Sequence, residues 1–145
     1  YAKNRYGSFI PYHLATKEFF EIARDHLTTN GVVAYNVIGT FQGWRADILG
    51  SVYATMKSVF PNVYLFPAKE TLNVVIIGTK SPQKTDFNVV QQRANALVQA
   101  KRVTLPAFRG RTSSFRADPP ANFQISPVLS DDFAPVDGLL RKAGK

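Results

Sequence analysis

The chain has 145 residues, no cysteine, and a hydrophobic fraction of 45%. This length suits one domain or a large part of one, and the hydrophobic content excludes a disordered chain. Without cysteine there is neither a disulfide framework nor a thiolate zinc site. No apolar run reaches the roughly 20 residues of a membrane helix, and the N-terminus lacks the pattern of a signal peptide. We therefore expect a cytoplasmic protein.

The net charge of +8 is distributed unevenly. Residues 80–116 carry eight basic side chains against a single acid, Asp86. Such a stretch can attract phosphate groups, form a solvated surface, or dock on an acidic partner. Nucleic acid is the disfavoured partner, because neither a recognition helix nor an RNA-binding aromatic motif accompanies the charge.

The first half of the chain predicts a loop, a helix, a strand and a second helix. Residues 1–12 indicate a loop, since glycine, serine and proline interrupt any periodicity. Thr16 has the properties of a helix N-cap, and Asn30-Gly31 predicts a left-handed helix terminator. The apolar run Val32–Ile38 is typical of a buried strand, central in a parallel sheet. Helical spacing of apolar residues predicts two core-facing sets, Phe19, Phe20, Ile22, Ala23 and Leu27, then Ile48, Leu49, Val52, Tyr53, Met56, Val59 and Phe60.

The second half predicts two strands and a third helix. Pro61 ends the preceding helix. The short connection between Asn62–Phe66 and Asn73–Thr79 predicts an antiparallel pair. Asp86 is the expected cap of a helix, and residues 101–130 should form a long irregular surface segment. The expected apolar face of this third helix consists of Phe87, Val90, Ala94, Leu97 and Val98.

The element order predicts an α/β layer architecture whose sheet is incomplete. Three strands alone would leave the apolar strand 32–38 close to a sheet edge, which exposes unpaired backbone groups. Further strands should therefore come from an absent N-terminal half or from a partner chain. The exposed side of such a sheet also predicts self-association, so we expect a homo-oligomer. Because the chain begins at Tyr1 without methionine, we expect a processed product, an excised domain or the ordered part of something longer.

Three segments together carry a family resemblance: IPYHLATKEFF at 10–20, NGVVAYNVIG at 30–39 and LSDDFAPVD at 129–137. They resemble, in order, the proline-containing loop and helix start, the next turn and strand, and the C-terminal signature of spermidine-synthase-like proteins. The last segment is similar to that of a bacterial branch in which some members are fused to membrane domains. The resemblance implies the C-terminal half of a Rossmann-like S-adenosylmethionine-dependent methyltransferase fold over residues 1–100. Residues 101–145 would be an irregular extension packed on it.

Members of this family transfer an aminopropyl group from decarboxylated S-adenosylmethionine to a diamine such as putrescine. In the family, a glycine-rich loop holds the nucleotide, and a carboxylate pair after the fourth strand binds and deprotonates the amine. This chain contains no Gly-x-Gly-x-x-Gly pattern, and its first acid is Glu18. The resemblance therefore implies that the catalytic carboxylate would fall upstream of Tyr1. Alone, the chain should neither bind the nucleotide nor catalyse the reaction.

Four residues are candidates for the wall of a substrate pocket. Asn36 lies near the carboxyl end of the apolar strand, where open α/β sheets bind ligands; alternatively, it is a turn-forming asparagine. Tyr12 can line the pocket, and His13 can carry protons or simply pack at a helix start. Phe66 occupies the position of a tyrosine in spermidine synthases, and the missing hydroxyl leaves the identity of the acceptor open.

Other candidates have structural alternatives. Gln42 and Trp44 follow the apolar strand and can border the pocket, with packing as the favoured role for the tryptophan. Asp131 and Asp132 can bind a cation or an amine, or fix the C-terminal segment against the sheet. Two aspartates without a histidine make a poor metal site, so no metal is predicted.

Three functions remain open from the sequence. The first is an aminopropyltransferase-like fragment that is active only with its N-terminal half. The second is a methyltransferase-like relative that acts on another substrate. The third is a non-catalytic domain that binds a polyamine or an anionic partner.

Overall fold

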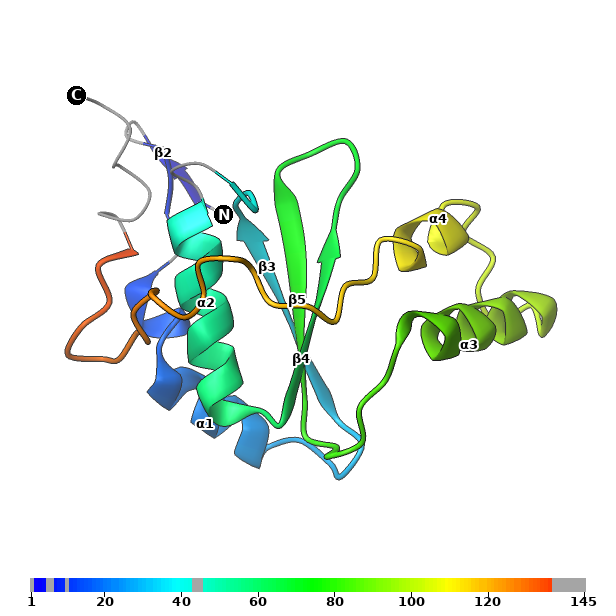
Figure 1. The fold of residues 1–145 in the computed structure, drawn as a ribbon, viewed down its shortest axis with the longest axis horizontal. Helices are drawn as coiled ribbons and strands as arrows, with labels where there is room; N and C mark the ends of the chain where they lie inside the picture. Colours follow the sequence, from blue (N-terminus) through cyan, green and yellow to red (C-terminus); the bar gives the residue numbers. More distant parts are fainter. Residues whose placement is uncertain (1, 5–6, 10, 43–45, 137–145) are drawn as a thin grey trace.

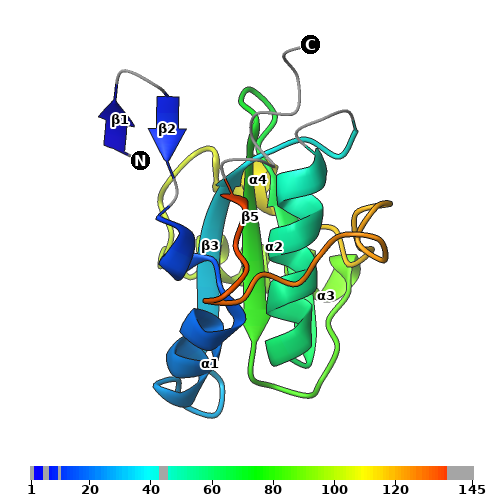
Figure 2. The same ribbon diagram turned by 90° about the vertical axis from the view of Figure 1, so that its left-hand side faces the viewer.

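A computed structural model describes residues 2–4, 7–9, 11–42 and 46–136 (Figures 1 and 2). A three-stranded sheet lies at its centre, with α1 and α2 on one face (Figure 2). The strands are β1 (Ala2–Asn4), β2 (Gly7–Phe9), β3 (Val32–Ile38), β4 (Asn62–Pro67) and β5 (Asn73–Thr79). The helices are the 3-10 turn η1 (Tyr12–Leu14), α1 (Lys17–Asp25), α2 (Ala46–Val59), α3 (Phe87–Gln99) and α4 (Phe108–Thr112).

The central sheet has the strand order β3-β5-β4, and both neighbouring pairs are antiparallel. The predicted antiparallel pairing of β4 with β5 is confirmed. The prediction that β3 is a central strand of a parallel sheet is wrong for this chain, because among the described strands β3 pairs only with β5. Its predicted place close to an edge is confirmed. The apolar run was misleading because β-branched residues favour strands at the edge as well as at the centre.

Helix α2 is the main cover of the sheet. All seven of its predicted core-facing residues are buried, and the helix ends at Val59, before Pro61. Proline at this position cannot continue a helix, since it lacks the backbone N–H. Phe60 follows the helix and remains in the core, where it is only 2% exposed. The apolar spacing therefore identified this element correctly.

Helix α1 begins as predicted and ends early. Thr16 caps it, since its Oγ1 accepts a hydrogen bond from the backbone N–H of Phe19 at 3.3 Å. The helix stops at Asp25, and neither Asn30 nor Gly31 has the predicted left-handed conformation. The predicted apolar face is also too wide. Phe20 is fully buried and Phe19 packs partly buried against the core, whereas Ile22 is 61% exposed.

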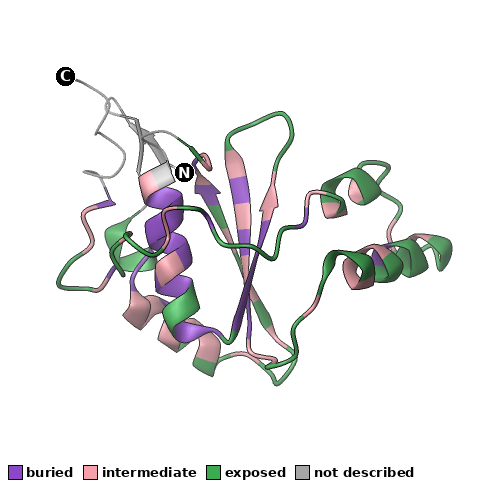
Figure 3. Ribbon diagram, in the orientation of Figure 1, coloured by how far each residue is buried: buried purple, intermediate pink, exposed green. Residues whose placement is uncertain are grey.

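The two faces of the sheet differ in burial (Figure 3). Cross-strand partners point to the same side of a sheet. One face carries Tyr35, Ile76 and Leu65 in one row, and it packs against α1 and α2. The opposite face carries Asn36, Val75 and Phe66 in the next row. We call this second side the open face, because its β3 positions Val32, Ala34 and Asn36 are exposed.

The segment that follows α4 runs across α2 and completes the core (Figure 1). Leu129 and Val136 are buried in the same cluster as the α2 side chains. The Oγ1 of buried Thr55 accepts a hydrogen bond from the Leu129 N–H at 2.9 Å and donates one to the Ser51 carbonyl at 2.6 Å. Gly50 allows the close approach of this segment, since a Cβ there would lie 2.3 Å from the Ser126 Oγ. The segment is thus irregular, as predicted, and is also attached to α2 by a hydrogen bond and by buried side chains.

Helices α3 and α4 form an arm beyond the β4 edge of the sheet (Figure 1). Asp86 caps α3 as predicted, accepting the Val89 N–H at 2.9 Å. Of the predicted apolar face, only Ala94 is buried, and Phe87 is 46% exposed. The apolar face predicted for this helix is therefore largely at the surface of the described structure. Residues 101–130 were expected to be irregular, but they contain α4, which the Gln91 Nε2 joins to α3 by a 2.9 Å hydrogen bond to the Thr112 carbonyl.

The C-terminus of α3 contains an unusual lysine. Lys101 has a φ of 54°, and it is the one non-glycine residue with positive φ among the described positions. Its N–H donates to the Val98 carbonyl at 3.0 Å, and the Arg102 N–H donates to the Leu97 carbonyl at 2.9 Å. This pair of bonds forms a Schellman motif, in which glycine is the preferred left-handed residue.

Replacing Lys101 with glycine should stabilise the protein. The left-handed conformation costs an L-residue about 1 kcal/mol that glycine does not pay. We expect Lys101→Gly to raise the free energy of unfolding by about 1 kcal/mol, equivalent to about 3 °C in Tm. Thermal unfolding followed by circular dichroism measures this. A lower Tm would show that the lysine side chain itself contributes more than the strain costs.

The N-terminal segment also departs from prediction. Residues 1–12 were expected to form a loop, but β1 and β2 pair in an antiparallel hairpin with Ala2 opposite Phe9. Three-residue strands are too short for alternation to be recognised in the sequence. Among the described residues, none of the helices is long and apolar enough to cross a lipid bilayer.

Candidate functional site

Two of the four candidate pocket residues lie on one row of the open face. Asn36 of β3 and Phe66 of β4 both pair with Val75 of β5, so all three side chains point to the same side of the sheet. Tyr12 and His13 lie on η1, which precedes α1. The sheet register therefore brings Asn36 and Phe66 onto a common surface, with one apolar side chain between them.

Asn36 belongs to a polar network near one end of the sheet. Its Nδ2 donates to the Oδ1 of Asn73 at 3.1 Å, and the Asn73 Nδ2 donates to the Thr71 Oγ1 at 2.9 Å. Asn36 lies inside β3, so its interpretation as a turn-forming residue is wrong. The network fixes the orientation of the amide, while the side chain stays exposed to solvent. An exposed, oriented amide can both donate to and accept from a ligand.

Phe66 is part of an aromatic cluster on the open face. Its ring meets Phe115 edge-on, with 5.5 Å between centroids, and Tyr64 contacts the same ring at 5.3 Å. The Tyr64 hydroxyl accepts a hydrogen bond from the Thr85 N–H at 2.8 Å. The C-terminal segment thus covers the β4 side of the open face, and Phe66 forms an apolar boundary beside Val75.

Tyr12 and His13 lie at the surface ahead of α1. Their rings contact each other edge-on at 5.5 Å, and Tyr12 is 56% exposed. The His13 carbonyl accepts a hydrogen bond from the Thr16 Oγ1 at 3.4 Å, which links η1 to the cap of α1. Figure 2 shows η1 between β2 and α1, on the same side of the molecule as β3. Both rings are thus accessible to a ligand or a partner chain.

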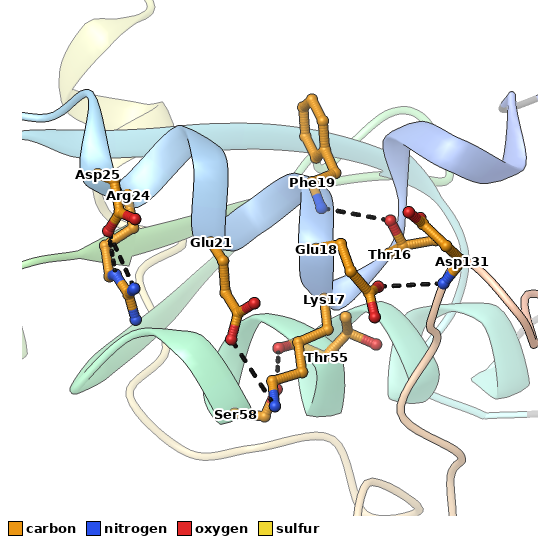
Figure 4. Close-up of polar contacts among 10 residues, drawn as sticks. All are labelled: Thr16, Lys17, Glu18, Phe19, Glu21, Arg24, Asp25, Thr55, Ser58 and Asp131. Carbon is orange, nitrogen blue, oxygen red and sulfur yellow. Dashed lines mark hydrogen bonds and ion pairs between the residues drawn. The ribbon is translucent and has the colours of Figure 1, made fainter.

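Asp131 and Asp132 form the tip of a turn that lies against α1 (Figure 4). Two 3.0 Å backbone hydrogen bonds between Ser130 and Phe133 close the turn. The Asp131 N–H donates to the Glu18 Oε2 at 3.0 Å, and both aspartate side chains are exposed. The backbone of this turn, rather than its carboxylates, attaches the C-terminal segment to α1.

Sequence reasoning missed three of the residues that hold the C-terminal segment in place. Glu18 is an acid in the first turn of α1, and its Oε2 also accepts a hydrogen bond from the Asp131 N–H. Thr55 is an ordinary helical position by pattern, yet it holds Leu129. Arg116 lies with its guanidinium 4.5 Å from the centroid of the Phe41 ring. No local signal could reveal these contacts, because each joins residues far apart in the chain.

The pKa of the Tyr53 side chain clearly departs from its ordinary value. Burial raises the pKa of the Tyr53 phenol, and the nearby Asp118 and Tyr64 raise it further. The phenol therefore stays neutral at physiological pH. No group of three or more potential metal ligands occurs among the described residues.

Two further candidates follow β3 in the sequence. Gln42 is exposed beyond β3, and Trp44 lies outside the described residues.

Comparison with known proteins gives one informative match. No protein-family model matches the chain, and neither does any solved structure. The chain is similar to a polyamine aminopropyltransferase of Vibrio vulnificus (strain CMCP6), with 29% identity over 136 residues. The match covers 92% of this chain, which spans 42% of the length of the relative. This likeness supports a spermidine-synthase-like relationship.

Proposed function

We propose that this chain supplies the C-terminal part of a spermidine-synthase-like aminopropyltransferase, which makes a polyamine in the cytoplasm. This proposal rests on the similarity to a polyamine aminopropyltransferase, which extends over 92% of the chain. Because the chain spans only 42% of that relative, we place the nucleotide site and the catalytic carboxylate in a further N-terminal half. The chain alone would then be inactive.

The order of the elements supports this proposal. From α1 the chain continues through β3, α2 and the antiparallel pair β4 and β5. This is the order that the family resemblance implies for the second half of a Rossmann-like methyltransferase fold. The β3 edge that faces away from β5 can accept a further strand, which the N-terminal half or a second chain would supply. The same exposed edge supports self-association of the chain.

In the proposed reaction, the amine nitrogen attacks the aminopropyl carbon next to the sulfonium. The C–S bond breaks, methylthioadenosine leaves, and the amine loses a proton to a base in the N-terminal half. On this chain, the Asn36 amide would orient the polar part of the acceptor, with Phe66 bounding its apolar part and Tyr12 and His13 lining the entrance. Decarboxylated S-adenosylmethionine would bind the other half, since this chain lacks a glycine-rich nucleotide loop.

The proposal is tested by assaying two proteins with putrescine and decarboxylated S-adenosylmethionine. One is residues 1–145 alone, and the other is this chain joined to the N-terminal part of the Vibrio relative. We expect spermidine and methylthioadenosine, measured by mass spectrometry, only from the joined protein. Asn36→Ala in the joined protein should raise KM for putrescine, because the oriented amide is lost.

Two outcomes would count against the proposal. Product formation by residues 1–145 alone would show that the proposed division of the site is wrong. A folded joined protein that forms no aminopropylated product would argue against aminopropyl transfer. Circular dichroism confirms folding in both cases, which separates a lack of activity from a lack of structure.

The environment of Phe66 favours a second candidate, a methyltransferase-like relative with a different acceptor. The phenyl ring lacks a hydroxyl for a diamine and packs against Phe115. Loss of a hydrogen bond to a polar acceptor typically costs about 1 kcal/mol or more. Methyl transfer from S-adenosylmethionine to a non-diamine acceptor by the joined protein would support this candidate.

A further inference from the structure

Among the described residues, the strongest charge concentration lies in the α3–α4 arm, from the C-terminal end of α3 through α4. Between positions 101 and 111 there are four basic residues and no acid. All four side chains are exposed, and the same segment contains the exposed leucines Leu97 and Leu105. We call this set the basic tip: Leu97, Lys101, Arg102, Leu105, Arg109 and Arg111.

The arm holds the basic tip away from the sheet and from the candidate pocket residues (Figure 1). The described chain forms two ion pairs, Lys17–Glu21 and Arg24–Asp25, both within α1. The nearest acid in sequence, Asp118, lies seven residues beyond Arg111 and acts on Tyr53 of α2, while Asp86 caps the opposite end of α3. Neither of these ion pairs involves a cation of the basic tip, whose exposed charges can attract an acidic ligand from solvent.

The conformation of Lys101 is a second, independent observation. Glycine would fit its positive φ without strain, yet the position carries a lysine. Strain of this kind is often found at functional positions, where the side chain is needed despite its effect on stability. Here the side chain adds a cation between Leu97 and Arg102.

We propose that the basic tip is a docking site for an acidic segment of a partner protein. Cations provide attraction to carboxylates, and Leu97 and Leu105, exposed by 39% and 49%, provide the apolar contacts typical of a protein interface. Arginine is enriched at such interfaces because its guanidinium binds carboxylates in a bidentate manner.

Two other partners fit less well. A second copy of this chain carries a net charge of +8, so it offers the basic tip little acidic surface, and the proposed self-association uses the β3 edge instead. A nucleic acid favours a row of cations along a helix, whereas α3 carries one cation, Arg93, among the exposed amides Gln92, Asn95 and Gln99. The charge is concentrated in the turn between the helices and in α4, which suits a short acidic segment.

The test measures binding of fluorescent poly-L-glutamate by anisotropy at low ionic strength. Three variants are compared with the unaltered chain: Arg109→Gln/Arg111→Gln, Lys101→Gly, and a control, Lys57→Gln/Lys69→Gln. The control removes the same charge as the double arginine variant, from exposed positions outside the arm. We expect the arginine variant to weaken binding about fivefold, as two exposed ion pairs would predict, and the control less than twofold.

Lys101→Gly separates function from structure, because it should weaken binding while raising Tm. A control variant that weakens binding as much as the arginine variant would overturn the proposal, since the effect would then be one of net charge. Absence of poly-L-glutamate binding by the unaltered chain would also overturn it. Tighter binding of a duplex oligonucleotide, lost in the arginine variant, would assign the basic tip to nucleic acid instead.

Discussion

Replacing Phe20 with alanine should cost about 3–4 kcal/mol of unfolding free energy, the largest effect expected from a single change in this chain. Phe20 is fully buried and contacts the rings of Phe19 and Tyr35, each 5.2 Å away between centroids. It is the one buried residue of the nine in α1. Its removal would leave a cavity between this helix and the sheet, and the helix is too short to be stable alone.

Urea unfolding followed by circular dichroism measures this loss, and Ile22→Ala is the matched control. Ile22 lies two positions further along the same helix but is 61% exposed. Its truncation should change the free energy of unfolding by no more than about 0.5 kcal/mol. Equal losses at the two positions would mean that α1 packs on the sheet through a different face.

The second large effect is expected at Gly78, near the end of the central strand β5. A Cβ built there would lie 2.5 Å from the Cδ2 of Phe60 and 2.8 Å from its Cγ. The Phe60 side chain is only 2% exposed, so it has little room to move. We expect Gly78→Ala to lower the free energy of unfolding by about 2 kcal/mol through overpacking, measured by urea unfolding.

Two further variants establish whether the cause is steric. Gly110→Ala in α4 is a matched control, because a Cβ there meets no heavy atom within 4 Å. This substitution should be neutral or stabilise by up to about 1 kcal/mol, since alanine favours helix. In the background of Phe60→Leu, Gly78→Ala should cost at least about 0.5 kcal/mol less. Additive losses in this double-mutant cycle would contradict a clash with Phe60.

The sequence predicted elements whose signals are local. The N-caps Thr16 and Asp86, the apolar face of α2 and the pairing of β4 with β5 all follow from short-range patterns, and the structure confirms them. In each case the pattern that gives the signal lies within a short stretch of sequence. Capping residues, helical spacing and a short connection were therefore enough to predict these elements from the sequence.

The errors concern tertiary context. Ile22 and Phe87 fit a helical apolar face, but nothing in the sequence shows which part of that face contacts the sheet. The strand β3 has the composition of a central strand, yet its neighbours depend on which segments are present. For the candidate site, the register placed Asn36 beside Asn73, a contact across 37 residues that no pattern indicates.

The attachment of the C-terminal segment also bears on the order of folding. The bond from Leu129 to Thr55 joins residues 74 positions apart, and the bond from Asp131 to Glu18 joins residues 113 positions apart. Closing such large loops is slow, because the entropy is lost before any contact forms. During synthesis, α2 would emerge from the ribosome long before Leu129. The apolar side of α2 that faces away from the sheet would therefore stay exposed to water until Leu129 is made. The C-terminal segment that contains Leu129 and Val136 therefore determines when water is finally excluded from the hydrophobic core.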